Sequence, residues 1–181
     1  MWSTGGWRPC PRAVCRKAAC WRRRRRSLLR SPNLFADPRT PAGEGARLLA
    51  VDVVGLALLF AAIVGCETLD VNLEAIIDRN ACWKFHRDHV PVRLLTTYRG
   101  PGTQLVSARY ARRALHEQQM YHGPLTELAA GTVAMFKGSS TGIVGGGVHR
   151  SPPIAGTGIA RLVLKVDLPS AASPPPWAPH R

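Results

Sequence analysis

Short alternating segments, separated by glycine- and proline-rich turns, constrain the fold of residues 69–168 more than any other feature of the sequence. Leu69–Asp78 and Ala160–Asp167 alternate apolar and polar residues, with the period of two that is typical of a half-buried strand. Val90–Tyr98 and Gly131–Phe136 are predicted to form two further short strands. This pattern favours a β-sandwich or barrel over a parallel sheet with crossover helices.

The strongly apolar run at residues 48–66 has three interpretations. A helix over residues 48–65 that packs on the protein core is the one we favour, because it ends near a glycine and has a continuous apolar stripe. We expect that stripe to face the core; it comprises Leu48, Val51, Leu56, Leu59 and Ile63. A membrane span and a signal peptide stay open as alternatives, although Asp52 disfavours a span.

Positive charge is concentrated at the N-terminus. Residues 1–47 hold 12 of the 25 Lys and Arg residues and two of the 11 acidic ones. The segment is also rich in Pro, Gly and Ser and has no apolar periodicity, so we expect it to be disordered. The run Arg22–Arg26 predicts weak, salt-sensitive binding to polyanions rather than specific recognition of a nucleic acid.

The remaining sequence predicts one globular domain over residues 48–168, followed by a disordered Pro-rich tail at 169–181. Within the domain, Ala108–Gln119 is predicted to be helical. The chain has five cysteines. An odd number without a clear export signal fits a reducing compartment, so we expect a cytoplasmic protein, with membrane attachment the less favoured alternative.

A cluster of metal-ligand residue types lies at Phe85–His89. If His86 and Asp88 lie on extended chain, their side chains point to the same face and can share one divalent ion. His149, which follows a glycine-rich loop, is the best third ligand. Two histidines and one carboxylate leave coordination positions open, an arrangement that suits non-haem Fe(II), although Zn(II) or Mn(II) can use similar ligands.

Several neighbouring residues offer alternatives to this set. His89 is an alternative to His86 as a ligand, and Cys82 is able to complete a Cys/His/Asp zinc site instead. Arg150, next to the third ligand, is a candidate anion binder. Tyr98 and Arg99 precede a Gly-Pro-Gly turn; they either fix a hairpin or contact a substrate.

The order of these features resembles that of the 2-oxoglutarate/Fe(II) oxygenase superfamily, which has a proximal H-x-D, a distal His and a later Arg. The matching residues are His86, Asp88, His149 and Arg161. The resemblance implies a double-stranded β-helix, or jelly-roll, of the cupin-like kind, preceded here by one apolar helix. It also implies that Fe(II) and 2-oxoglutarate are cofactors, with the Arg161 guanidinium holding the distal carboxylate of 2-oxoglutarate. The sequence departs from that pattern between the ligands, where a basic, helix-prone segment replaces clear strands.

Residues 51–168 more closely resemble the bacterial domain-of-unknown-function family 1826, through three distinctive strings. They are CWKFHRDHVPVRLLTTYRGPGT from Cys82, GTVAMFKG from Gly131 and VHRSPPIAGTG from Val148. That family has no established activity, so three functions remain in competition. The first is a 2-oxoglutarate-dependent oxygenase, the second a non-catalytic cupin-like module that binds a metal or small ligand, and the third a structural domain without metal.

Overall fold

The computed structural model describes residues 43–140 and 146–170. The N-terminal residues to 42 and the tail from 171 lie outside the described residues, and with them most of the two segments expected to be disordered. The chain divides into two compact units. One comprises Met1–Asp70 with Pro169–Arg181, and the other comprises Val71–Leu168.

The first unit contains one long apolar helix, α2 (Glu44–Val64), so the predicted helix is present but begins four residues earlier than expected. It ends at Gly65, whose φ of 65° is left-handed and whose N–H donates to the Ala61 carbonyl, a common way to end a helix. The early start corrects the prediction of disorder at residues 44–47. By length and composition, α2 is the one helix in the described part of the chain that is able to cross a membrane.

The core-facing stripe predicted for α2 is wrong. Leu48, Val51, Leu59 and Ile63 are 63%, 71%, 52% and 49% exposed. The buried positions are instead Val53, Ala57, Phe60 and Val64. Because the helix is apolar on nearly all sides, its sequence pattern does not specify which side is buried.

The second unit is built around a four-stranded sheet with strand order β1-β7-β2-β5. Strand β2 runs antiparallel to both β7 and β5, and places Leu95 opposite Lys165 on one side and Ala134 on the other. The strands are β1 (Asp70–Ile77), β2 (Val92–Arg99), β5 (Val133–Lys137) and β7 (Ala160–Asp167). All four lie within one or two residues of the strands that the sequence predicts.

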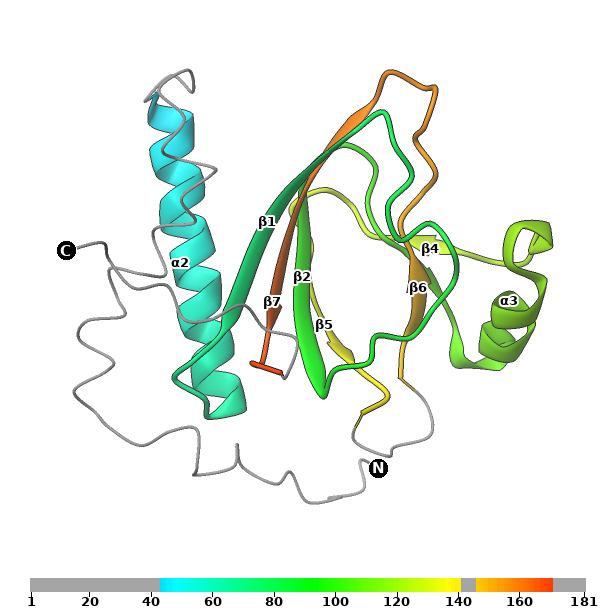
Figure 1. The fold of residues 1–181 in the computed structure, drawn as a ribbon, viewed down its shortest axis with the longest axis horizontal. Coiled ribbons are helices and arrows are strands. Elements are labelled where there is room, and N and C mark those ends of the chain that lie inside the picture. Colours follow the sequence, from blue (N-terminus) through cyan, green and yellow to red (C-terminus); the bar gives the residue numbers. More distant parts are fainter. Residues whose placement is uncertain (1–42, 141–145, 171–181) are drawn as a thin grey trace. The chain divides into compact units, whose positions relative to one another are not determined.

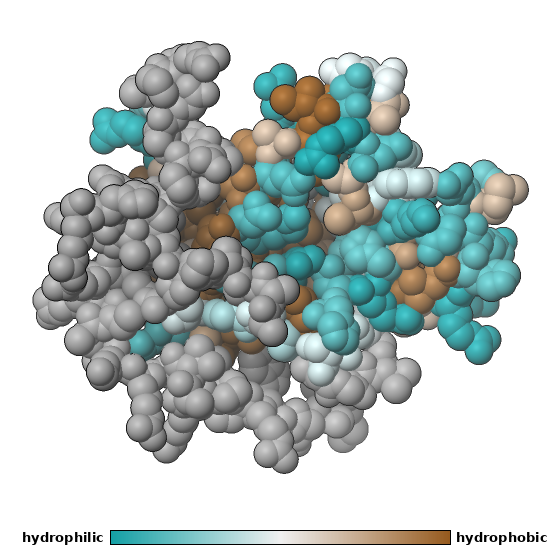
Figure 2. Space-filling view, in the orientation of Figure 1, coloured by the Kyte–Doolittle hydropathy of each residue, from teal (hydrophilic) through white to brown (hydrophobic). Residues whose placement is uncertain are grey.

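A smaller antiparallel sheet with order β4-β3-β6 faces the first (Figure 1). Its strands are β3 (Gln104–Val106), β4 (Thr126–Glu127) and β6 (Val148–Arg150). Between β3 and β4 the chain forms the predicted helical excursion, with 3-10 turns η1 (Ala108–Tyr110) and η2 (Gln118–Met120) flanking α3 (Ala111–Glu117). Helix α3 packs its alanines against Val148 of β6. The surface over α3 is mostly hydrophilic (Figure 2).

Apolar side chains fill the space between the two sheets. The four-stranded sheet and the loop before β7 supply the buried members, and Leu105 of β3 packs against them from the smaller sheet. The buried members are Ile76, Leu95, Phe136, Ile154 and Val163. The alternation predicted for the first strand fails at its end, because Ile77 is 67% exposed and Ile76 is buried. Two adjacent isoleucines leave the phase of the alternation undetermined, and the sheet places Ile76 in the core.

The unit is therefore mainly β, with two antiparallel sheets, and the chain has one apolar helix before it, which confirms the coarse fold class. The cupin-like double-stranded β-helix is a more specific arrangement, and it stays a prediction.

Candidate metal centre

Backbone pairing places the two candidate histidines side by side. His86 and His149 form an isolated antiparallel bridge, in which each N–H donates to the other residue's carbonyl at 3.0 and 3.1 Å. Residues directly opposite in such a pair point to the same face. The ring centroids of His86 and His149 are accordingly 4.6 Å apart. His86 thus extends the edge of the smaller sheet next to β6.

The residues that follow β5 hold the backbone of Asp88 in place. The Asp88 carbonyl accepts hydrogen bonds from the Ser139 backbone N–H and hydroxyl, at 2.9 and 3.2 Å. Gly138 lies so close to this segment that an added Cβ would be 1.8 Å from the Val90 carbonyl oxygen. Glycine is therefore needed at position 138 for the chain to pass, and the backbone of Asp88 is held against the residues that follow β5.

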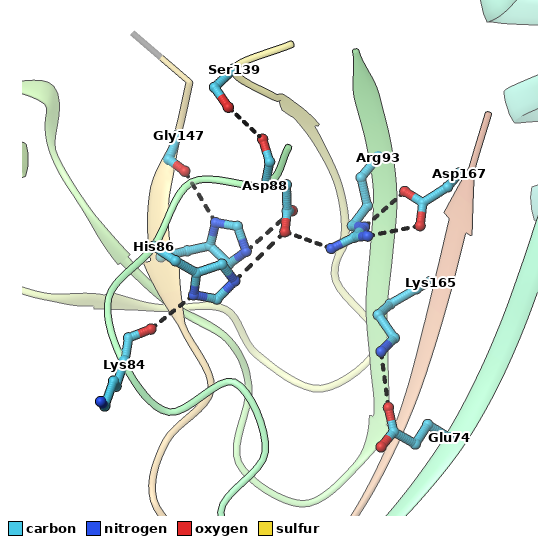
Figure 3. Close-up of polar contacts among 10 residues, drawn as sticks. Glu74, Lys84, His86, Asp88, Arg93, Ser139, Gly147, Lys165 and Asp167 are labelled. Atoms are coloured by element: carbon cyan, nitrogen blue, oxygen red, sulfur yellow. Dashed lines mark hydrogen bonds and ion pairs between the residues drawn. The ribbon is translucent and has the colours of Figure 1, made fainter. Parts of the chain in front are cut away.

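The His86 ring and the Asp88 carboxylate point toward each other (Figure 3), and His149 belongs to the same group of possible ligands. One nitrogen each from His86 and His149 and one oxygen of Asp88 all lie within 4.8 Å of one another. The Nε2 atom of His149 is 3.4 Å from Oδ2 of Asp88, and Nε2 of His86 is 3.6 Å from Oδ1. Neither of the alternative ligands, Cys82 or His89, belongs to this group among the described residues.

Hydrogen bonds to backbone carbonyls indicate the tautomer of both histidines. The Nδ1 atom of His86 is 2.8 Å from the Lys84 carbonyl oxygen, and that of His149 is 3.1 Å from the Gly147 carbonyl oxygen. Because a carbonyl only accepts, each Nδ1 carries a hydrogen, and in the neutral form of each ring the Nε2 lone pair is directed at Asp88. Metal-binding histidines commonly have this arrangement.

The facing carboxylate oxygen lacks a donor. Oδ2 of Asp88 is buried and has no hydrogen-bond partner within the described part of the chain. A buried acceptor without a partner is costly, and here the nearest imidazole atom is Nε2 of His149, at 3.4 Å. Neutral histidines of this tautomer cannot satisfy that oxygen, whereas a cation between the three atoms can. The donor set therefore fits a divalent metal ion.

The pKa values of the two histidines are shifted in opposite directions. The interaction with the Asp88 carboxylate raises the pKa of His86 above its usual value, against the effect of burial. Burial lowers the pKa of His149, although the Asp88 charge opposes this. Burial alone raises the pKa of Asp88, but contact with His86 and the charges of His149 and Arg93 outweigh it and leave that pKa below its usual value.

Arg93, which the sequence analysis did not single out, ties Asp88 to the four-stranded sheet. Its Nη1 donates to Oδ1 of Asp88, while Nε and Nη2 donate to the two carboxylate oxygens of Asp167 at 2.8 Å each. The available signal was an arginine at an inward position of a predicted strand, two residues before the buried Leu95. The partner at position 167 is 74 residues away and gave no local signal.

Phe136 also supports the centre. Its ring stacks on His149 with a centroid distance of 4.7 Å and an interplanar angle of 27°. Phe136 lies directly opposite Arg93 in the β2–β5 pair. Adjacent positions of the four-stranded sheet thus support a carboxylate ligand and an imidazole ligand.

A cleft between the two sheets opens beside the centre. Both candidate imidazoles line it, together with apolar core side chains and the cross-strand ion pair of Lys165 and Glu74, whose N···O distance is 2.9 Å. The full lining is Glu74, Ile76, Ala81, Cys82, His86, Arg93, Leu95, Thr103, His149, Ser151, Val163 and Lys165. A concave, partly apolar site with a few convergent polar groups is typical of small-ligand binding.

Arg161 lies elsewhere on the same sheet. It is 1% exposed and does not line the cleft. Its guanidinium donates to the Pro101 carbonyl at 2.8 Å and is 3.5 Å from the Thr97 hydroxyl. Within the described ranges, no carboxylate forms an ion pair with it, and burial lowers its pKa.

The other predicted site residues do not line the cleft. Arg150 points away from the centre, donates to the Gln104 side chain at 2.8 Å and lies over the Phe85 ring. Tyr98 is half-buried near the end of β2, and Arg99 is exposed. Gly100, with a φ of 82°, then turns the chain, which agrees with the interpretation that these residues precede a tight turn.

Comparison with known proteins identifies the family and no relative of known activity. A search of the curated proteins finds no match. The family described as "Protein of unknown function (DUF1826)" matches residues 13–167, which is most of the chain. The chain therefore belongs to the DUF1826 family.

Proposed function

We propose that this protein binds one divalent metal ion through Nε2 of His86, Nε2 of His149 and the carboxylate of Asp88. The observation that carries the proposal is the Asp88 carboxylate between two imidazoles whose Nδ1 atoms are occupied by backbone carbonyls. Its Oδ1 is nearest to His86, and its buried Oδ2, which faces His149, has no hydrogen-bond partner among the described residues. A cation relieves this juxtaposition of three acceptors. Two histidines and one carboxylate also leave positions for a further ligand.

The cleft indicates what that further ligand is: a small molecule with an anionic group. The cleft has apolar walls of Leu95 and Val163, and its charged residues include Lys165. Among the residues that the structure describes, the Lys165 ammonium donates one side-chain hydrogen bond, to Glu74, which leaves donors for a carboxylate. A ligand that binds the metal at one end and Lys165 at the other suits this arrangement.

For the reaction class, we propose an Fe(II)- and 2-oxoglutarate-dependent oxygenase in a cupin-like unit. The ligand set is the one that such iron sites use, and the bound iron supplies the chemistry with dioxygen. Arg161 is a second candidate for the carboxylate of 2-oxoglutarate, because a buried guanidinium without a carboxylate partner favours an anion. The chain's own residues would hold the ion, orient the co-substrate and exclude water from the cleft.

The alternative is a metal- or small-ligand-binding module that catalyses no reaction. One observation favours it: Arg161, the residue that distinguishes an oxygenase, does not line the cleft. The same three ligands then serve a module in which Arg161 contributes to packing alone.

Metal analysis of protein purified without a polyhistidine tag tests the centre. We expect one equivalent of metal in the wild-type protein and loss of metal in His149→Ala and Asp88→Asn. His122→Ala is the matched control, because His122 is exposed and lies outside the cluster. Absence of bound metal in the wild-type protein after incubation with Fe(II), Mn(II) or Zn(II) would refute the proposal.

Anaerobic addition of Fe(II) and 2-oxoglutarate separates the two functions. An oxygenase gives a weak visible charge-transfer band, and Arg161→Gln and Lys165→Gln identify which cation holds the co-substrate. A protein that binds Fe(II) with no band at saturating 2-oxoglutarate is a metal-binding module instead.

A further inference from the structure

We infer that Arg93 and Asp167 hold Asp88 so that it binds the metal through one oxygen, Oδ2, which keeps the centre open to a chelating ligand. This inference rests on the proposed metal-binding function and extends it. It assigns positioning roles to two residues outside the ligand set, and it specifies how many coordination positions face the ligand.

The hydrogen bond from Arg93 makes the two carboxylate oxygens of Asp88 inequivalent. Nη1 of Arg93 donates to Oδ1, and this oxygen is also the one nearest to His86. Oδ2 receives no hydrogen bond and faces His149. A carboxylate whose Oδ1 is already committed to a guanidinium presents Oδ2 alone to the metal. Outer partners of this kind commonly set the orientation of metal ligands.

Sheet pairing fixes Arg93 itself. Arg93 of β2 and Asp167 of β7 lie directly opposite in the antiparallel register, and they form two parallel hydrogen bonds of 2.8 Å. This fork-to-fork contact allows the guanidinium little rotation. The orientation of Asp88 is therefore determined by the central strands of the larger sheet, although Asp88 itself lies in the irregular segment before β2.

One-oxygen binding has a chemical consequence. A six-coordinate ion with two imidazoles and one carboxylate oxygen keeps three positions for other ligands. An oxo- or hydroxycarboxylate fills two of these through adjacent oxygens and leaves one free. Without Arg93, the Asp88 carboxylate is free to rotate and bind through both oxygens, as carboxylates do when unconstrained. One of the three positions would then be closed.

Mn(II) is the probe for this inference, because the relaxation of water protons reports how many waters the bound ion carries. We expect Arg93→Gln to bind Mn(II) about 10–100-fold more weakly than the wild-type protein. We also expect its bound ion to carry roughly one water fewer. Asp167→Asn removes only the anchor of Arg93 and should change both quantities in the same direction but by less.

Arg113→Gln is the matched control, because it breaks an exposed pair with Glu117 on α3, away from the centre. If wild-type protein binds Mn(II) and Arg93→Gln matches it in affinity and water number, the inference is overturned while the proposed function stands. Failure of the wild-type protein to bind Mn(II) or any other metal overturns the proposed function. If Arg93→Gln does not fold, as judged by circular dichroism, Asp167→Asn decides in the same two measurements.

Discussion

The four-stranded sheet carries two inward arginines whose surroundings differ sharply. The Arg93 side chain is 19% exposed and contacts the carboxylates of Asp88 and Asp167. Arg161 is more deeply buried, at 1% exposure, yet its hydrogen-bond partners among the described residues are the neutral oxygens of Pro101 and Thr97. Within one sheet, the less buried arginine is paired with carboxylates, and the more buried one forms no ion pair with any described carboxylate.

This difference separates two roles for the same residue type. A buried charge with well-placed partners is strongly coupled to them, so removing it leaves their charges exposed to the same low-polarity surroundings. A buried charge without a counter-charge is itself the unfavourable group, and it is kept for its hydrogen bonds or for a ligand. Arg93 thus supports Asp88, a ligand of the proposed metal centre, whereas the described carboxylates form no ion pair with Arg161.

The largest effect should come from Arg93→Met, which leaves Asp88 and Asp167 unpaired in the metal-free protein. We expect a loss of about 3 kcal/mol in the free energy of unfolding, measured by urea denaturation without metal. Adding Asp88→Asn to this variant should recover part of the loss, since the second substitution removes an unpaired charge. Equal stability of Arg93→Met and the wild type would show that the two arginines do not differ as described.

The next effect is a pH dependence of metal affinity, which comes from the ligands. Arg93 does not contribute to it, because burial lowers its pKa but the hydrogen bond to Asp167 and the nearby carboxylates outweigh this and raise it above its usual value. The Asp88 carboxylate raises the pKa of His86, and a proton on Nε2 competes with the metal. Affinity should therefore be highest above the pKa of His86 and fall by about tenfold per pH unit below it. Titration of Mn(II) at several pH values measures this, and a flat profile between pH 5 and 8, in roughly the range where histidines titrate, would exclude His86 as a ligand.

Arg161→Met tests the other side of the comparison and should have the opposite sign to Arg93→Met. Replacing an uncompensated buried charge by an apolar side chain of similar length should leave stability unchanged or raise it by about 1 kcal/mol. The same urea denaturation measures it. A loss of several kcal/mol would mean that the bond to the Pro101 carbonyl holds the fold together, and that Arg161 is structural.

The smallest effect is expected for Lys165→Gln, at a cation whose pair is partly exposed. Lys165 and Glu74 are 21% and 27% exposed, and Glu74 keeps a second partner in Arg79. We expect a loss of about 0.5 kcal/mol, in the range of solvent-accessible ion pairs. A loss as large as that of Arg93→Met would show that Arg79 does not compensate Glu74 when Lys165 is removed.

Most strands of the larger sheet can be predicted from the sequence. The residues of β7 alternate between apolar and polar, and a glycine- and proline-rich turn marks the end of β2. Strands β3 and β4 were missed because three and two residues are too short to establish a period. The prediction of which face of α2 is buried is wrong, because nearly every position of the helix is apolar. In each case, tertiary contacts supply information that local pattern lacks.

The candidate centre also has residues that local sequence predicts and residues that only tertiary contacts bring together. His86 and Asp88 are two residues apart, so their convergence is a local property that the sequence contains. His149 was chosen from the order of elements, and the structure pairs its backbone with that of His86. Arg93 and Asp167 were missed because their contact depends on the register of β2 with β7, which only the folded sheet specifies.

Anomalous diffraction from crystals soaked in Mn(II) tests the metal centre most directly. We expect one strong peak between the two sheets, about 2.1 Å from Nε2 of His86 and Nε2 of His149 and a similar distance from Oδ2 of Asp88. Oδ1 of Asp88 should remain on Arg93. A fully soaked crystal with no peak at this position, or with the ion bound elsewhere, would contradict the account.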